Sequence, residues 1–195
     1  SYVTARLLLD SLRSEALSFL GIAQAATHTE MHYRYAATLK PYIEKGVELG
    51  LLSPHLLEFD LNILGEALEA DRDQQFTYLG LQTLYDRYFI HSEGTRFELP
   101  QVFFMRVAMG LASNEENREQ RAIEFYNLIS SFDYMVSTPQ LFNSGTLRPQ
   151  LSSCFLTTVP DDLDGIYSAI RDNAMLSKWA GGLGNDWTPV RALGA

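Results

Sequence analysis

The chain has 195 residues, of which 46% are hydrophobic and 20% are charged, so it can bury a core and is not a disordered polypeptide. Its formal net charge of −9 argues against general binding to nucleic acid, although a few basic residues would suffice for one local anion site. It has no apolar run of about 18 residues, no secretory signal and no disulfide framework, so we expect a cytoplasmic protein that does not insert into a membrane.

The first two thirds of the sequence predict helices, because apolar residues recur at helical spacing between capping and breaking residues. Thr29 is the expected cap of the second helix and Gly50 its end, whereas Ser53 caps a helix that opens with Pro54. The predicted helices cover residues 2–20, 29–49, 54–70, 76–90 and 100–111, followed by one that Asn114 or Asn117 caps and that runs to Tyr134, with a turn at Ser92–Arg96.

The pattern changes at Thr138, where short apolar stretches alternate with turns. We predict β segments at Leu141–Phe142, Cys154–Val159 and Val190, and a flexible loop at Gly181–Asp186. One helix is expected over residues 162–179, with an apolar-to-small stripe formed by Leu163, Ile166, Tyr167, Ile170, Ala174 and Ser177. A strand, a helix and a second strand indicate the opening of an α/β layer, so we divide the chain into a helical domain, 1–136, and an α/β domain, 137–195.

The only cysteine, Cys154, follows a polar segment, residues 137–150, that is rich in hydroxyl and amide groups. A single cysteine cannot form an intramolecular disulfide, so a redox role would need a partner thiol from elsewhere. Unpaired cysteines are commonly inert buried residues. The polar groups beside this one, such as Ser153, favour the alternative of a thiol next to a small polar ligand, because buried polar groups need hydrogen-bond partners.

A second polar group surrounds the helix predicted over residues 162–179. Asp161 and Asp162 precede this helix, Lys178 lies at its end, and Arg191 follows the glycine-rich segment. On spacing alone, these residues describe a capped helix with a basic C-terminus that complements its dipole. The functional alternative is a nucleotide site, in which a carboxylate accepts a hydrogen bond from a sugar hydroxyl while Lys178 and Arg191 bind phosphates.

The four histidines offer a possible metal site at one place only. His28 and His32 are four residues apart, a spacing that puts two ligands on one side of a helix. No cluster of carboxylates or cysteines in the sequence completes a site around them. We therefore predict that His28, His32, His55 and His91 are surface residues and that the chain holds no metal.

Three ordered groups of motifs cover nearly the whole chain: Phe76–Tyr88 with Glu98–Ala112; Ser137–Thr146 with Ser152–Leu156; and Asp161–Tyr167 with Ser177–Gly184 and Arg191–Gly194. Together they resemble the large, catalytic subunit of class I ribonucleotide reductase. The resemblance implies a mainly α N-terminal region followed by the first elements of a ten-stranded α/β barrel.

The resemblance also implies roles for individual residues. Cys154 would supply reducing equivalents as the ribose 2′-hydroxyl leaves and would become half of a disulfide. Ser137, Thr138 and Ser153 match positions that bind the ribonucleoside diphosphate substrate. An allosteric specificity site for a deoxynucleotide effector would be formed by Asp161, Asp162, Leu163, Lys178 and Arg191, and the helix over 162–179 would pack across a dimer.

By the same resemblance, several parts of the enzyme lie outside this sequence. The thiyl-forming cysteine, the partner of Cys154 and a C-terminal cysteine pair would follow residue 195, and an ATP-binding regulatory domain would precede residue 1. We therefore expect a piece of a larger polypeptide that is inactive alone. It would bind no cofactor itself, take a deoxynucleoside triphosphate or ATP as effector, and rely on a radical cofactor in a partner subunit.

The implied partners are the remainder of the large subunit, a second large subunit in a homodimer, a small radical-generating subunit, and thioredoxin or glutaredoxin as reductant. The implied role is deoxyribonucleotide synthesis for DNA replication. An alternative of another class is a non-catalytic nucleotide-binding or assembly module that keeps the effector and dimer surfaces.

Overall fold

The computed structural model describes residues 1–179 and 181–194, which divide into two compact units. The first unit contains residues 1–136 and 140–149, and the second contains residues 137–139 and those from 150 onward. Residues 140–149 belong to the first unit because Arg106 binds them, donating hydrogen bonds to the carbonyl oxygens of Leu141 (3.2 Å) and Ser144 (2.7 Å).

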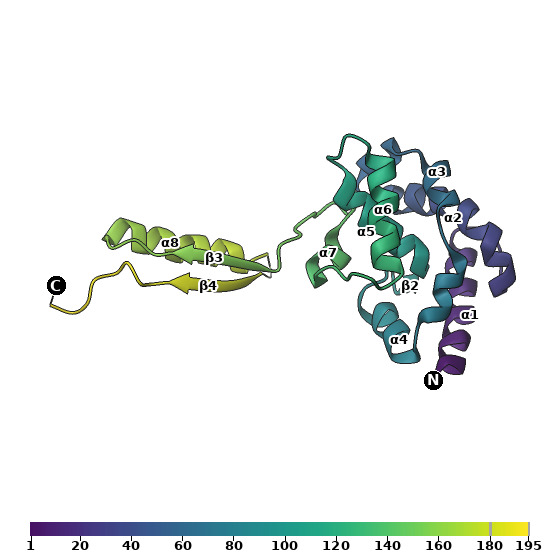
Figure 1. Ribbon diagram of the computed structural model, residues 1–195, viewed down its shortest axis with the longest axis horizontal. Coiled ribbons are helices and arrows are strands. Elements are labelled where there is room, and N and C mark those ends of the chain that lie inside the picture. The colour runs from purple at the N-terminus through teal and green to yellow at the C-terminus, as the bar shows by residue number, and fades with distance from the viewer. Residues whose placement is uncertain (180, 195) are drawn as a thin grey trace. The chain divides into compact units, whose positions relative to one another are not determined.

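The first unit is built mainly from helices (Figure 1). Among the described residues, no helix combines the length and the apolar composition needed to cross a bilayer. The elements of this unit are α1 (Tyr2–Phe19), α2 (His28–Glu48), η1 (Pro54–Glu58), α3 (Leu61–Glu66), η2 (Ala70–Gln75), α4 (Tyr78–Arg87), β1 (His91–Ser92), β2 (Thr95–Arg96), α5 (Pro100–Ala112) and α6 (Arg118–Ser130); α7 (Thr138–Asn143) lies where the chain passes between the units.

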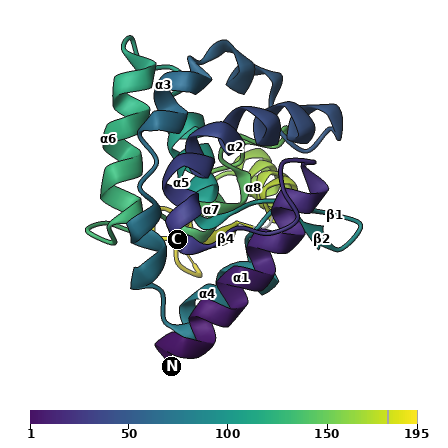
Figure 2. The ribbon, with the colours of Figure 1, turned by 90° about the vertical axis from the view of Figure 1, so that its right-hand side faces the viewer.

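The core of the first unit is centred on α5. Every residue from Phe97 to Met109 is buried, and the predicted helix start at Pro100 is confirmed. The helices contact one another in pairs, α5 with α6, α2 with α3 and α1 with α4, and Figure 2 shows α1 lying along α4. Each large apolar side chain buried in this way contributes about 1.5–3 kcal/mol relative to exposure.

The first two helices agree with the predicted ranges, but the predicted cap of α2 is wrong. The cap is Thr27 and not Thr29, because Thr27 is spaced three residues from Glu30 and the two form a reciprocal capping box. The predicted end is confirmed, since Gly50 has a φ of 67° just beyond α2, a conformation that favours glycine.

The single helix predicted from Pro54 to Ala70 is divided. Ser53 and Pro54 start only a short 3₁₀ turn, η1. Asp60 then begins a new helix, α3, because its carboxylate accepts hydrogen bonds from the backbone N–H groups of Asn62 and Ile63, each at 3.1 Å. A capping residue inside the predicted range therefore stopped one helix and started another.

The helices predicted over 76–90 and up to Tyr134 are shorter than expected. Thr77 caps α4, and the chain after α4 forms the β1–β2 hairpin, whose turn holds Glu93 and Gly94 at φ values of 50° and 89°. Of the two predicted caps for α6, Asn117 occupies the N-cap position, and the helix ends at Ser130.

A buried polar cluster around Asp73 connects helices of this unit. The carboxylate of Asp73 accepts hydrogen bonds from the Tyr35 hydroxyl (2.8 Å), the Gln101 amide (2.8 Å) and the Arg13 guanidinium (3.4 Å). Burial raises the pKa of Asp73, and these three donors oppose that rise. Since the donors come from α2, α5 and α1, the cluster joins η2 to three helices.

The second unit contains β3 (Cys154–Thr158), α8 (Leu163–Ser177) and β4 (Gly182–Asp186). The two strands are parallel, and Cys154 pairs with Gly182 at one end while Thr158 pairs with Asp186 at the other. Asp162 caps α8, accepting a hydrogen bond from Gly165 N at 2.7 Å. The predicted strand–helix–strand order is confirmed.

The position of the second strand was predicted wrongly. The segment Gly181–Asp186, predicted to be a flexible loop, contains β4, and Val190 is in no strand. The glycines of the segment Gly181–Asp186 allow close packing against β3. A Cβ on Gly181 would collide with the ring of Phe155, and one on Gly184 would lie 2.9 Å from a Leu156 methyl group. Residues 141–142, predicted as a β segment, lie in helix α7.

Candidate functional site

Cys154 is the first residue of β3 and its thiol is free and exposed. Opposite it on β4 is Gly182, where an added Cβ would lie 3.4 Å from the sulfur. The sulfur is therefore bordered by a backbone that carries no side chain, which leaves room for a ligand to approach. Of the two alternatives for this cysteine, the structure therefore contradicts the buried one, because Cys154 is exposed.

The nine residues predicted to form the sites all belong to the second unit: Ser137, Thr138, Ser153, Cys154, Asp161, Asp162, Leu163, Lys178 and Arg191. Ser153 precedes the cysteine, and its carbonyl oxygen accepts a hydrogen bond from Gly182 N at 2.9 Å. Thr138 begins α7 and is exposed, whereas Ser137 is half-buried. The carbonyl oxygen of Ser153 is thus engaged with β4, and the side chain of Ser153 is exposed.

Asp161 and Arg191 meet at the carboxyl end of the two strands. The carboxylate of Asp161 accepts hydrogen bonds from the backbone N–H of Arg191 (3.2 Å) and from its guanidinium Nε (2.6 Å). These contacts, the backbone one first, lower the pKa of the Asp161 carboxyl. The carboxyl edge of parallel strands is where ligands commonly bind in α/β sheets, so this ion pair lies at a favourable place for a ligand site.

The structure does not bring Lys178 to this ion pair. Asp162 and Leu163 lie at the start of α8 near Asp161, but Lys178 is the C-cap of that helix. The helix separates Asp162 from Lys178 by about 24 Å, since each residue advances the axis by about 1.5 Å. Lys178 therefore lies nearer to the amino ends of the strands than to Arg191.

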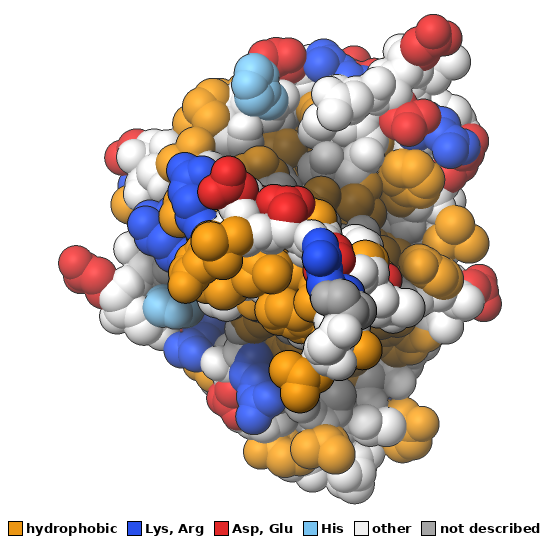
Figure 3. All heavy atoms as spheres, turned by 90° about the vertical axis from the view of Figure 1, so that its left-hand side faces the viewer, with side chains coloured by type: hydrophobic (Ala, Val, Ile, Leu, Met, Phe, Trp, Pro, Cys, Tyr) orange, Lys and Arg blue, Asp and Glu red, His pale blue; other side chains and the backbone are white. Residues whose placement is uncertain are grey.

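Two features of α8 complete the description of this unit, and only one of them was predicted. The amide of Asn173 bonds to Thr157 on β3 (3.2 Å) and to Asn185 on β4 (2.7 Å), which holds the helix on both strands. Sequence reasoning missed this contact, although an Asn in the middle of an apolar helix was a possible signal. Within the predicted stripe, Leu163, Tyr167 and Ile170 are 70%, 65% and 50% exposed, whereas Ile166 is half-buried. Figure 3 shows that exposed hydrophobic side chains are numerous in the view it presents. An exposed apolar stripe of this kind is suited to contact with another surface.

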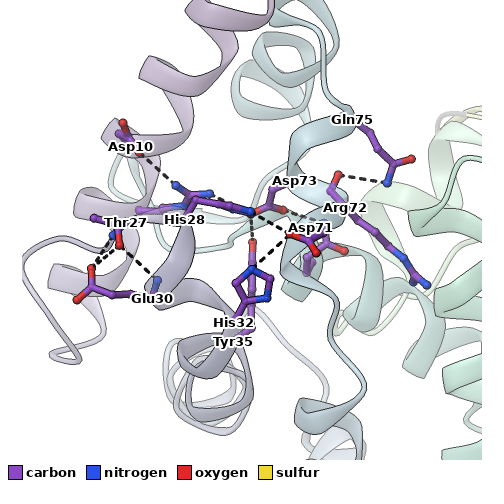
Figure 4. Close-up of polar contacts among 12 residues, drawn as sticks. Asp10, Thr27, His28, Glu30, His32, Tyr35, Asp71, Arg72, Asp73 and Gln75 are labelled. Atoms are coloured by element: carbon purple, nitrogen blue, oxygen red, sulfur yellow. Dashed lines mark hydrogen bonds and ion pairs between the residues drawn. The ribbon is translucent and has the colours of Figure 1, made fainter.

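One cluster among the described residues could hold a metal ion, and it lies in the first unit. His28, His32 and Asp71 place one ligand atom each within 4.8 Å of the others (Figure 4). The prediction that no carboxylate completes a site around the two histidines is therefore wrong. Asp71 is distant in sequence, and only the fold brings η2 to the start of α2.

Comparisons with known proteins agree with this architecture. Residues 74–149 match the family described as ribonucleotide reductase, all-alpha domain, and residues 152–195 match ribonucleotide reductase, barrel domain. The chain is 53% identical over 195 residues to the ribonucleoside-diphosphate reductase subunit alpha of Chlamydia trachomatis and 40% identical over 197 residues to that of Helicobacter pylori. Both matches cover 100% of this chain, but only 18% and 23% of the respective relatives.

A eukaryotic relative matches a smaller part. The large chain of ribonucleoside-diphosphate reductase from Schizosaccharomyces pombe is 43% identical over 133 residues, which is 68% of this chain and 16% of that relative. This chain therefore belongs to the ribonucleotide reductase large-subunit family, and it spans about a fifth of the length of the curated bacterial relatives. The predicted fold class, a helical region followed by the start of the barrel, is confirmed.

Proposed function

We propose that this chain is part of a large subunit that reduces ribonucleoside diphosphates to deoxyribonucleoside diphosphates by radical chemistry. The observation that supports this proposal is the exposed, free thiol of Cys154 at the start of β3, opposite the side-chain-free Gly182. The family membership and the relatives' names support the same activity.

In the proposed reaction the ribose 2′-hydroxyl leaves as water, and a pair of thiols supplies the electrons and protons and becomes a disulfide. Cys154 is one of these thiols. The second must come from outside residues 1–195, because this sequence has no other cysteine. Thioredoxin or glutaredoxin would then reduce the disulfide, and a small partner subunit would hold the radical cofactor.

We assign substrate binding to Ser137, Thr138 and Ser153, whose hydroxyl and backbone groups can bond to the sugar and phosphate oxygens of a nucleoside diphosphate. We assign the binding of an allosteric deoxynucleotide or ATP effector to the carboxyl edge of the strands. The residues of that proposed specificity site are Asp161, Asp162, Leu163 and Arg191 at this edge, together with Lys178 from the opposite end of α8.

The position of Lys178 supports a dimer in this proposal. About 24 Å of helix separates it from Asp162, so one copy of the chain is poorly suited to offer both to a single nucleotide. A second large subunit that packs along the exposed stripe of α8 would bring another Lys178 into reach. The effector would then bind where two copies meet.

The test replaces Cys154 by serine in the complete large subunit, assayed with its radical-generating subunit, an effector and thioredoxin. We expect Cys154→Ser to abolish deoxynucleotide formation and to leave effector binding unchanged. A matched control, Ser152→Ala, changes an exposed neighbour outside the proposed site and is expected to keep turnover.

Two outcomes would contradict the proposal. Turnover that survives Cys154→Ser would rule out the redox role of this thiol. If the unaltered assembly bound the effector but formed no deoxynucleotide, the alternative of a non-catalytic nucleotide-binding or assembly module would be favoured.

A further inference from the structure

Two histidine side chains and a carboxylate converge at the start of α2. The Nε2 atoms of His28 and His32 lie 3.1 and 3.3 Å from the same Oδ1 atom of Asp71. Figure 4 shows both rings extending from α2 toward the aspartate of η2. The geometry points to a site that nothing in the ribonucleotide reduction chemistry above requires.

The local structure positions these three groups before any ion binds. The capping box of Thr27 and Glu30 fixes the first turn of α2, and His28 and His32 then project from the same side one turn apart. Asp71 is held by its neighbour Asp73, which is fully buried and accepts a 2.8 Å hydrogen bond from Tyr35 of α2. The segment that carries the carboxylate is therefore tied to the helix that carries the histidines.

Two of the three ligand-to-ligand distances match those on a small divalent ion, and all three ligand atoms lie within 4.8 Å of one another. Zn²⁺ binds nitrogen and oxygen at about 2.0–2.1 Å, so two ligands of a tetrahedral ion lie about 3.3 Å apart. The two nitrogen–oxygen distances of 3.1 and 3.3 Å agree with that separation. The Nδ1 atom of His28 is buried and has no hydrogen-bond partner, so Nε2 is the only ring nitrogen of His28 that an ion can reach.

The surroundings also suit a cation. The side chains of His28, His32 and Asp71 are 30%, 49% and 75% exposed, which leaves the open side of the cluster free for water to complete the coordination. The guanidinium groups nearby are already paired, Arg34 with Glu30 and Arg13 with Asp73. Among the described residues, the groups within ion-pair distance of Asp71 are the two histidines themselves.

We propose that His28, His32 and Asp71 bind a divalent transition-metal ion of the Zn²⁺ class, which joins α2 to η2. Imidazole and carboxylate ligands suit such ions, and the affinity order of first-row metals places Zn²⁺, Cu²⁺ and Ni²⁺ above Mn²⁺. The ion has a structural role, since it links Asp71 to two histidines about forty positions away in sequence. This proposal is independent of the redox role of Cys154.

The test measures Zn²⁺ binding to the complete large subunit by isothermal titration calorimetry and Zn²⁺-dependent thermal unfolding. An ion at 100-fold excess over its dissociation constant should raise the folded-to-unfolded ratio by about 100-fold. Loss of an outer-shell partner commonly weakens a metal site by about 10–100-fold, so removing ligands, as in the double variant His28→Gln/His32→Gln or in Asp71→Asn, should weaken Zn²⁺ binding by at least that factor. The matched control is His55→Gln, which removes a histidine that also contacts a carboxylate, Glu58 at 2.8 Å, but has no second histidine.

Co²⁺ provides a probe of the ligand type. The difference between the Co²⁺ spectra of the unaltered protein and of the double variant should show visible bands without a thiolate charge-transfer band, since the double variant keeps every cysteine of the complete subunit. Each variant is compared with itself with and without metal, so a loss of intrinsic stability does not affect the result. The proposal is overturned if the unaltered protein shows no Zn²⁺-dependent shift, or if the double variant binds Zn²⁺ as well as the His55→Gln control does.

Discussion

The buried ion pair between Glu98 and Arg106 provides the sharpest test of how the helical unit is stabilised. Both side chains are fully buried, and Arg106 donates to the two carboxylate oxygens at 2.8 and 3.0 Å. Tyr42 also donates its hydroxyl to this carboxylate. Burial alone would lower the pKa of Arg106, but Glu98 and Tyr42 hold that pKa above its ordinary value.

We predict that Glu98→Gln destabilises this unit by about 3 kcal/mol. Removing one partner of a buried ion pair commonly costs about 3–5 kcal/mol, because the other charge is left uncompensated. Glutamine keeps the shape and one acceptor oxygen, so the loss belongs at the lower end of that range. Removing Arg106 as well would restore only part of the lost free energy of unfolding, because Arg106 also donates hydrogen bonds to the backbone carbonyls of Leu141 and Ser144.

The assay is amide hydrogen exchange of α5 in the complete protein, read by mass spectrometry under conditions where exchange reports the opening equilibrium. A loss of about 3 kcal/mol corresponds to exchange that is faster by about 100-fold. The control Glu48→Gln removes an exposed pair with Lys45 and should change exchange little. If Glu98→Gln behaved like that control, the reasoning about the buried charge would be refuted.

Three further predictions concern packing and titration. Gly110→Ala should destabilise by about 1–3 kcal/mol, because its methyl group would collide with the backbone after α7. Gly80→Ala should instead raise the thermal midpoint slightly, because its added Cβ would make only an ordinary contact, 3.5 Å from the Thr77 hydroxyl. Arg191→Gln should raise the pKa of the Asp161 carboxyl toward 3.8, which an NMR titration would measure. That pKa is lower in the folded than in the unfolded protein, so the ion pair stabilises the fold above pH 3.8. This stabilisation is lost as the pH falls through the folded-state pKa of Asp161. Burial raises the pKa of Tyr126 from 10.0 to about 12, so stability should fall as pH rises through that interval, and Tyr126→Phe should reduce the fall measured by urea unfolding at each pH.

The helices that sequence predicted best are those with unambiguous boundary signals. Pro100 opens α5, and Gly50 follows α2, because each residue has a backbone preference that suits only that end of a helix. The division of the helix expected over residues 54–70 was harder to foresee. The periodicity of the apolar residues continues through it, and only the capping hydrogen bonds of Asp60 interrupt the helix.

In the second unit the errors came from glycine. Gly181, Gly182 and Gly184 predict flexibility when the sequence is considered alone. In the structure two of them permit close contact with the side chains of Phe155 and Leu156. A pairing of strands distant in sequence decided the conformation, and neither local propensity nor spacing contains that information.

Contacts between residues distant in sequence also decide which parts of the candidate sites could be predicted. Residues that cap or flank a helix, such as Asp162 and Lys178, were found because their chemistry is tied to a local element. Asp71 was missed because its partners are about forty positions away, and a carboxylate in an acidic chain gives no signal by itself. The fold brings it to the two histidines through Asp73, whose burial and hydrogen bonds fix η2 against α2. The buried Asp73 therefore positions the exposed Asp71 two residues away, and this placement turns the histidine pair into a potential three-ligand site.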